Sequence, residues 1–221
     1  VNQYLGGAGH DLLHGIQIQT VTRHLRRLAV FGDDLAEACG ITLRLLDHAR
    51  AIGAFDQIAL LEEPFPEELE IDIRDIPVRV AADESAHTDA DALRRIEMGY
   101  TAIALKPIAK TFSMSLKIAR LAHERGVPCF CADLTVNPVL VEWNKAVAAR
   151  LAPFPGLGLG LLETNGHQNY RNWESMRAHL PAPDAAWTRP RGGVFELDAD
   201  YYARSGGVLA PLPHHEKLGG F

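Results

Sequence analysis

The sequence lacks four features that would each assign it to a class of protein. It has no apolar run of 18 residues, so we expect no transmembrane helix, and its start does not have the pattern of a signal peptide. Its formal net charge is −6, which argues against a general nucleic-acid binder and against a protein of anionic membrane surfaces. It has only three cysteines, which indicate no disulfide framework and favour a reducing compartment, the cytoplasm.

The composition is that of a folded chain with a large core. Of the 221 residues, 47% are hydrophobic and 23% are charged, which suits one large domain or two small ones. The chain begins with Val rather than Met, and we interpret it as a fragment or a trimmed product.

From residue 57 onward, short apolar runs alternate with segments of helical periodicity. The five apolar runs, each bounded by turn residues, are 57–62, 78–83, 101–106, 127–133 and 157–163. The helical segments are 92–98, capped by Asp89 or Asp91; 113–125, ending at Gly126; and 138–151, opening with Pro138. This order predicts parallel strands joined by right-handed helical crossovers. Nearly continuous apolar strands favour a sheet that is covered on both faces.

The strand spacing suits a doubly wound sheet or a (β/α)₈ barrel, and a full barrel needs about 200–250 residues. Five strands are clear and 25–33 is a candidate sixth, so we predict an α/β fold with a partial or modified barrel of five to six βα units. We expect three regions: an atypical segment over 1–40, the barrel over 41–180, and a Pro- and Gly-rich extended wrap over 181–221 with a short strand near 193–197.

Each of the five predicted strands ends at a charged residue. These residues are Glu62, Asp83, Lys106, Asp133 and Glu163. Any single one is explained by a strand meeting solvent, but in a parallel barrel all five would lie on the rim where active sites occur. Five charged ends out of five therefore favour a site.

Carboxylates without nearby His or Cys favour a hard cation, Mg²⁺ or Mn²⁺. A cation also relieves the repulsion among clustered carboxylates. A lysine in a sheltered place beside a metal can serve as a base near neutral pH. Together these groups suit removal of a proton alpha to the carboxylate of a small substrate, with the metal stabilising the enediolate.

Three motifs, "LLEEPFP" (60–66), "VAADES" (80–85) and "AIALKPIAKT" (102–111), resemble successive strand-end motifs of the enolase superfamily. The similarity is closest to its mandelate racemase and muconate-lactonising branch, including dipeptide-epimerase-like members, and covers about 41–180. It implies metal ligands at Glu62 and Asp83 and an acid/base role for Lys106. The remaining implied positions are the supporting carboxylates Glu63 and Glu84 and the substrate-facing Asp133, Glu163 and Asn165.

The chain departs from that family pattern in several ways. The first metal ligand has no clear counterpart: Asp34, or Asp33, lies at about the right place, with an ordinary turn or helix cap as the alternative. Lys106 is the first lysine in the chain, so the Lys-x-Lys base of an earlier strand is missing, as is the small capping domain. Glu163-Thr164-Asn165 stands where dipeptide epimerases carry Asp-x-Asp.

The sequence thus supports two hypotheses. The first is a Mg²⁺-dependent racemase or epimerase, dehydratase or cycloisomerase, and the single candidate base favours the one-base reactions among these. The second is a non-catalytic remnant or fragment that lacks the first metal ligand, the Lys-x-Lys base and the cap. Exposed barrel edges would then favour self-association, so a homo-oligomer stays open.

Overall fold

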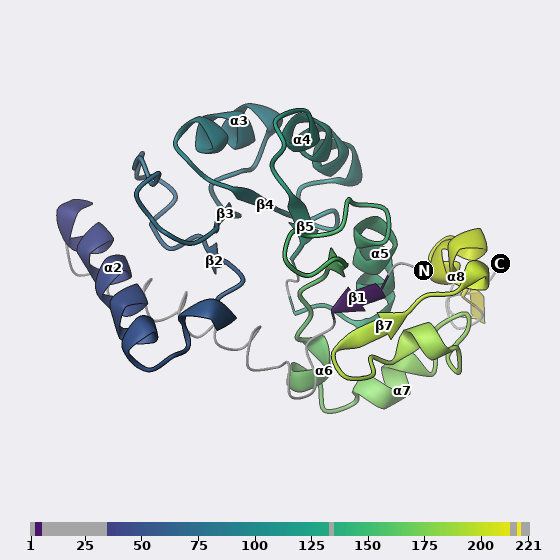
Figure 1. Cartoon of the computed structure of the whole chain (residues 1–221). Helices are drawn as coiled ribbons and strands as arrows, with labels where there is room; N and C mark the ends of the chain where they lie inside the picture. The colour runs from purple at the N-terminus through teal and green to yellow at the C-terminus, as the bar shows by residue number, and fades with distance from the viewer. Residues whose placement is uncertain (1–2, 6–34, 133–134, 213–215, 218–221) are drawn as a thin grey trace. The chain divides into compact units, whose positions relative to one another are not determined.

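The computed structural model describes residues 3–5, 35–132, 135–212 and 216–217 (Figure 1). Its contacts divide the chain into two compact units. Of the described residues, the first unit contains β1 (Gln3–Leu5), Lys106–Phe112 and those from Phe130 onward. The second unit contains residues 35–105 together with Ser113–Cys129. The predicted strand at 25–33 and the candidates Asp33, Asp34 and Asp133 lie outside the described residues.

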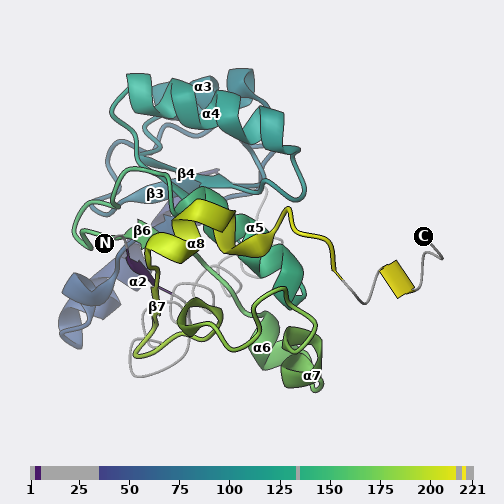
Figure 2. The same ribbon diagram turned by 90° about the vertical axis from the view of Figure 1, so that its right-hand side faces the viewer.

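The second unit is built on parallel strands with helices between them. Its elements are α2 (Leu35–Ala51), the 3₁₀ turn η1 (Phe55–Gln57), β2 (Leu61–Glu62), β3 (Val80–Ala82), α3 (Asp89–Glu97), β4 (Ala102–Leu105) and α4 (Phe112–Glu124). The sheet order is β2-β3-β4-β5, with β5 at Cys129–Cys131; β2 is parallel to β3, and β3 to β4. Figures 1 and 2 show α3 and α4 side by side over one face of this sheet.

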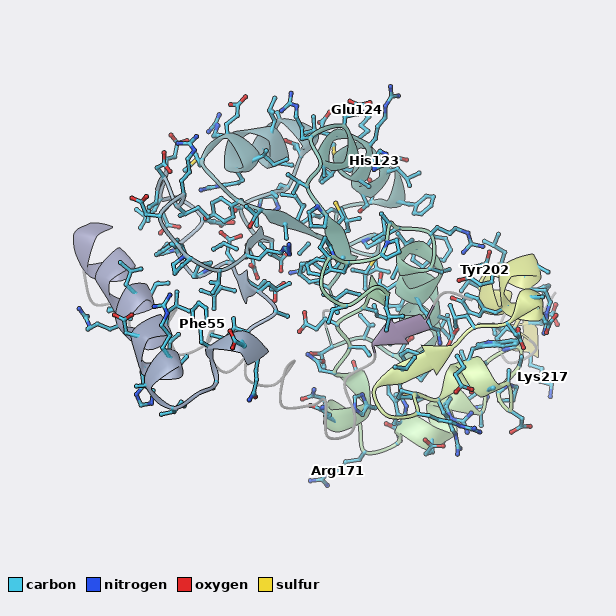
Figure 3. All side chains as sticks on the ribbon, in the orientation of Figure 1. Phe55, His123, Glu124, Arg171, Tyr202 and Lys217 are labelled. Atoms are coloured by element: carbon cyan, nitrogen blue, oxygen red, sulfur yellow. The ribbon has the colours of Figure 1, made fainter. Side chains whose placement is uncertain are left out.

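The strands of this unit are buried along their whole length. Every residue of β3 and β4 is buried, and Ile118 and Ala122 of α4 are fully buried as well. Polar side chains stay on the outside, as His123 and Glu124 do at the end of α4 (Figure 3). The predicted α/β class, with a parallel sheet covered by helices, is confirmed.

The first unit has a second, three-stranded sheet in the order β6-β1-β7. β1 runs parallel to β6 (Gly160–Leu161) and antiparallel to β7 (Val194–Glu196). Its other elements are α5 (Pro138–Ala148), α6 (Gly166–Asn169), α7 (Trp173–Arg177), η2 (Ala186–Thr188), α8 (Ala199–Arg204) and η3 (Ser205–Gly207). Cys131 forms an isolated parallel bridge with Leu162, which continues the order of the predicted strands.

Several boundaries differ from the prediction. The cap of α3 is neither Asp89 nor Asp91 but Thr88, whose Oγ1 accepts a hydrogen bond from Asp91 N at 3.2 Å while Asp91 Oδ2 accepts one from Thr88 N at 2.9 Å. This reciprocal pair is a capping box, which satisfies two otherwise unpaired backbone donors. α5 does open with Pro138, after an Asn137 side chain that accepts from Leu140 N.

The strands are also shorter than the apolar runs. Only Glu62 is the last residue of its strand; Asp83 and Lys106 come directly after β3 and β4, and Glu163 lies two residues after β6. The ladder ends early because the backbone already turns: Asp83 O accepts from Ala86 N, and Lys106 O accepts from Lys110 N. The expectation of strands running to Asp83 and Lys106 is therefore wrong by one residue each.

The segment from 181 onward is not simply extended. β7 confirms the short strand expected near 193–197, but α8 follows it, with Asp198 Oδ1 accepting from Tyr201 N at 2.8 Å as an N-cap. At the other end of the chain, α2 runs across residue 40. The division into regions 1–40, 41–180 and 181–221 stays a proposal. In the described part of the chain, none of the helices is both long and apolar enough to span a membrane.

Candidate functional site

Glu62 and Asp83 lie at the ends of adjacent parallel strands. Glu62 is 9% exposed and pairs with Ala81 of β3, and Asp83, two residues beyond Ala81, is 2% exposed. Paired residues share a face of a sheet and side chains alternate along a strand, so the register puts Glu62 and Asp83 on one face. Standard strand spacing and rise then separate their Cα atoms by about 8 Å. Two carboxylates at that separation can reach a common cation.

Glu63 differs from Glu62 in its backbone conformation and in the hydrogen bonds of its side chain. Its backbone φ is 37°, in the left-handed region, so the alternation of a regular strand is broken there. The side chain is 2% exposed, and Oε2 accepts hydrogen bonds from Asp83 N (2.6 Å), Ser85 N (3.2 Å) and Ser85 Oγ (2.9 Å). Oε1 is buried and has no hydrogen-bond partner within the described part of the chain.

The electrostatics of Glu63 follow from this environment. Burial raises the pKa of its carboxyl, and the hydrogen bonds from Asp83 and Ser85 lower the pKa but offset burial only in part. The negative charge of Glu84 raises it further. A nearby cation would favour the ionised form, so the strand ends form a place where positive charge is stabilising.

The other predicted positions are placed as follows. Glu84, half-buried, follows Asp83 in the same unit, whereas Lys106, 7% exposed, directly follows β4 and is grouped by its contacts with the first unit. Glu163 and Asn165 are half-buried in the first unit, where Glu163 N donates to Cys131 O. The structure thus brings together Glu62, Glu63 and Asp83, and describes Lys106, Glu163 and Asn165 in the other unit.

A divalent metal fits part of this arrangement. Within the described ranges, no three His, Cys, Asp or Glu side chains come together as a complete metal site. Glu62 and Asp83 nevertheless offer the carboxylate oxygens that Mg²⁺ and Mn²⁺ prefer, and Glu63 Oε1, which has no hydrogen-bond partner among the described residues, is an unsatisfied acceptor on the residue next to Glu62. These residues therefore fit two positions of a hard-cation site.

Sequence reasoning missed two residues that shape the strand ends. Ser85 is one, although it lies within the quoted "VAADES" motif; its hydroxyl and amide both bind Glu63. Arg95 is the other: this α3 residue is 6% exposed and donates to the carbonyl oxygens of Glu67 and Leu69, which holds the segment after β2. No sequence signal distinguishes Arg95 from an ordinary surface arginine.

The described residues form an α/β protein whose parallel strands end at buried carboxylates. The chain matches the family described as "Enolase C-terminal domain-like" over residues 23–165, about two thirds of its length, and it belongs to that family. The family expected from the three strand-end motifs is confirmed.

Solved structures were also compared with this chain, and one of those reported below reaches a TM-score of 0.5. A mandelate racemase/muconate lactonizing enzyme from Roseiflexus sp. is 17% identical with a TM-score of 0.51, over 75% of this chain and 56% of that one. Another match is a mandelate racemase/muconate lactonizing protein from Herpetosiphon aurantiacus, 15% identical with a TM-score of 0.49, over 74% of this chain and 53% of that one. A third is an L-Ala-D/L-Glu epimerase from Bacillus subtilis, 17% identical with a TM-score of 0.47, over 60% of this chain and 36% of that one. The chain spans about half the length of these relatives or less. No curated protein has a significant sequence match to it.

Proposed function

We propose that this chain carries the metal-binding and proton-transfer positions of an enzyme that removes a proton alpha to the carboxylate of a small substrate. The observation that carries the proposal is the pair of buried carboxylates, Glu62 and Asp83, on one face at adjacent parallel strand ends. Carboxylate oxygens are the ligands that Mg²⁺ and Mn²⁺ prefer, and two carboxylates on one face can hold one cation between them. Membership of the enolase-like family supports the same reaction class.

Glu62 and Asp83 would hold Mg²⁺ or Mn²⁺, with Asp34 or Asp33 proposed as a third ligand. When bound, the cation supplies positive charge that stabilises the charge developing on the substrate carboxylate. Glu63 and Glu84 would support the ligands. Asp133, Glu163 and Asn165 would orient the substrate.

Lys106 is the proposed base, whose neutral amine Nζ takes the α-proton and can return it to the product. Its 7% exposure and its place directly after β4 support this role, because a buried side chain is shielded from bulk water. A single base serves one face of the α-carbon. This favours dehydration or cycloisomerisation over epimerisation, which takes a base on each face.

The test starts with metal binding by the 221-residue chain. The chain is freed of metal, Mg²⁺ is titrated in, and thermal unfolding is followed. At a hundredfold excess over Kd, a specific site stabilises the fold by about 2.7 kcal/mol, which raises Tm by roughly 5–10 °C in a chain of this size. Glu62→Gln should abolish the rise. Glu68→Gln, which removes the same charge at an exposed position six residues on, should retain it.

Proton transfer is tested next, by NMR of α-proton exchange in D₂O with a panel of small carboxylates. Exchange should require Lys106 and disappear in Lys106→Met, but persist in Lys110→Met, four residues on. A Tm that Mg²⁺ leaves unchanged would instead support the alternative reading, a non-catalytic relative. Metal binding without exchange would refute the role of Lys106 and leave the metal site standing.

A further inference from the structure

One side chain links the two strand ends that carry the proposed metal ligands. Glu63 adjoins Glu62 on β2, yet its carboxylate bonds the amide of Asp83 and both the amide and the hydroxyl of Ser85, 20 and 22 residues away. All three donors converge on one oxygen, Oε2. The contact to Asp83 N, at 2.6 Å, is the shortest.

This link acts on the backbone that carries Asp83. With its N–H bonded to Glu63, the Asp83 backbone cannot rotate freely about its dihedrals, and Ser85 holds the turn that follows. The other end of the link is also rigid, because Glu63 N donates to Ala81 O at 2.9 Å. Residues 62–63 and 81–85 thus form a closed loop of hydrogen bonds around the two proposed ligands.

The backbone conformation of Glu63 supports a dedicated role. A φ of 37° is unfavourable for a residue with a Cβ, and such strain persists where surrounding contacts impose it. In a regular strand Glu63 would point to the face opposite Glu62. The left-handed turn instead lets its carboxylate reach the end of β3.

We propose that Glu63, through Ser85, is a positioning residue that fixes the spacing of Glu62 and Asp83 for a divalent cation, and is not itself a ligand. This inference rests on the proposed function. Partners that orient ligating carboxylates typically contribute 10–100-fold to metal affinity. We expect an effect of that size from breaking the link.

The experiment measures Mg²⁺ affinity by calorimetry and Tm without metal, in the 221-residue chain. Ser85→Ala removes the hydroxyl donor and leaves Glu63 in place; we expect the Kd for Mg²⁺ to rise about tenfold, with little change in the metal-free Tm. Ser85→Thr keeps a hydroxyl and should restore most of the affinity. The line shape of bound Mn²⁺ in electron paramagnetic resonance should change in Ser85→Ala and return in Ser85→Thr.

Two further variants separate positioning from ligation. Glu63→Gln keeps a carbonyl oxygen that can accept the same donors, so it should lose far less affinity than Glu62→Gln. If Glu63→Gln instead loses as much as Glu62→Gln while Ser85→Ala binds normally, Glu63 is a ligand and the positioning role is refuted. If Ser85→Ala lowers only the metal-free Tm, the link is structural and the proposal fails. If the unmodified chain binds no Mg²⁺, the proposed function fails, and this inference with it.

Discussion

Replacing Lys145 with Met should destabilise the first unit strongly, in a way that depends on pH. Lys145 is fully buried in α5, where its Nζ lies 2.5 Å from Glu142 Oε1 and 2.5 Å from Trp187 O, and 4.1 Å from the centre of the Phe195 ring. Glu142 is 3% exposed, and its Oε2 has no hydrogen-bond partner among the residues that the structure describes. Lys145→Met would therefore remove the ammonium that bonds this buried carboxylate.

Removing one partner of a buried ion pair costs about 3–5 kcal/mol. For a chain of this size that is a fall in Tm of roughly 10 °C. Lys117→Met, the same change at an exposed position of α4, should cost less than about 0.5 kcal/mol. Glu142→Met combined with Lys145→Met removes both charges and should recover most of the loss, because apolar side chains of similar size replace buried pairs at little cost.

The pH dependence follows from Glu142. Burial raises the pKa of its carboxyl above the ordinary 4.5 even with Lys145 present, although the ammonium lowers it, and burial lowers the pKa of Lys145. Without the ammonium the Glu142 pKa rises further. Because the pKa of Glu142 in the folded chain lies above its pKa in the unfolded chain, the free energy of unfolding falls as the pH rises past the unfolded pKa. The penalty of Lys145→Met should therefore be small near pH 4 and grow towards pH 8. Urea unfolding at both pH values measures it. A penalty below 1 kcal/mol at pH 8, or an equal one at pH 4, would refute this reasoning.

Three further outcomes are expected. Gly166→Ala should destabilise the fold by about 1–3 kcal/mol, seen as a lower urea midpoint, because a Cβ there would lie 2.2 Å from Val136 O; an unchanged midpoint would mean that the backbone yields easily. Thr88→Ala should cost about 1 kcal/mol as a lost cap. Since the Thr88 side-chain hydrogen bond lowers the Asp91 pKa, that difference should be present above about pH 4 and shrink as the pH falls through the lowered pKa, which acid titration of both proteins would show. Burial raises the pKa of the Cys129 thiol to about 12, so peptide mapping should find it unlabelled by a thiol reagent at pH 8 until denaturant is added, and labelling of the folded chain would contradict its burial.

The positions of the central strands were predictable because they are buried on both faces. A strand such as Val80–Ala82 has apolar residues throughout and turn residues on each side, and this pattern is local. The ends of the strands were not predictable to the residue. They depend on when backbone groups leave the ladder for a turn, as Asp83 O does when it accepts from Ala86 N.

Elements of the first unit were missed for a different reason. β1 has three residues and exists by pairing with Leu161 and Val194, which lie far away in the sequence. α7 has five residues, and its Arg177 bonds Pro183 O and Thr188 rather than following any helical pattern. Such short elements are determined by tertiary contacts, which no local window contains.

The candidate site was predictable in part. Glu62 and Asp83 were chosen from their motifs, and their role as ligands stays a prediction; the strand register places them on one face. The link between Glu63 and Ser85 was not predictable, because strand alternation would send Glu63 to the opposite face. Only the left-handed backbone at Glu63 brings the two residues together.

The pairing of β1 with β6 and β7 has a consequence for synthesis on the ribosome. Residues 3–5 leave the exit tunnel before their partners at 160–161 and 194–196, so the three-stranded sheet cannot close until residue 196 has emerged. The strands β2 to β4 and their helices lie within 61–124 and can assemble sooner. A ribosome stalled near residue 150 should therefore display a chain in which the Glu62–Asp83 end of the sheet is protected from proteases while β1 is still without its sheet.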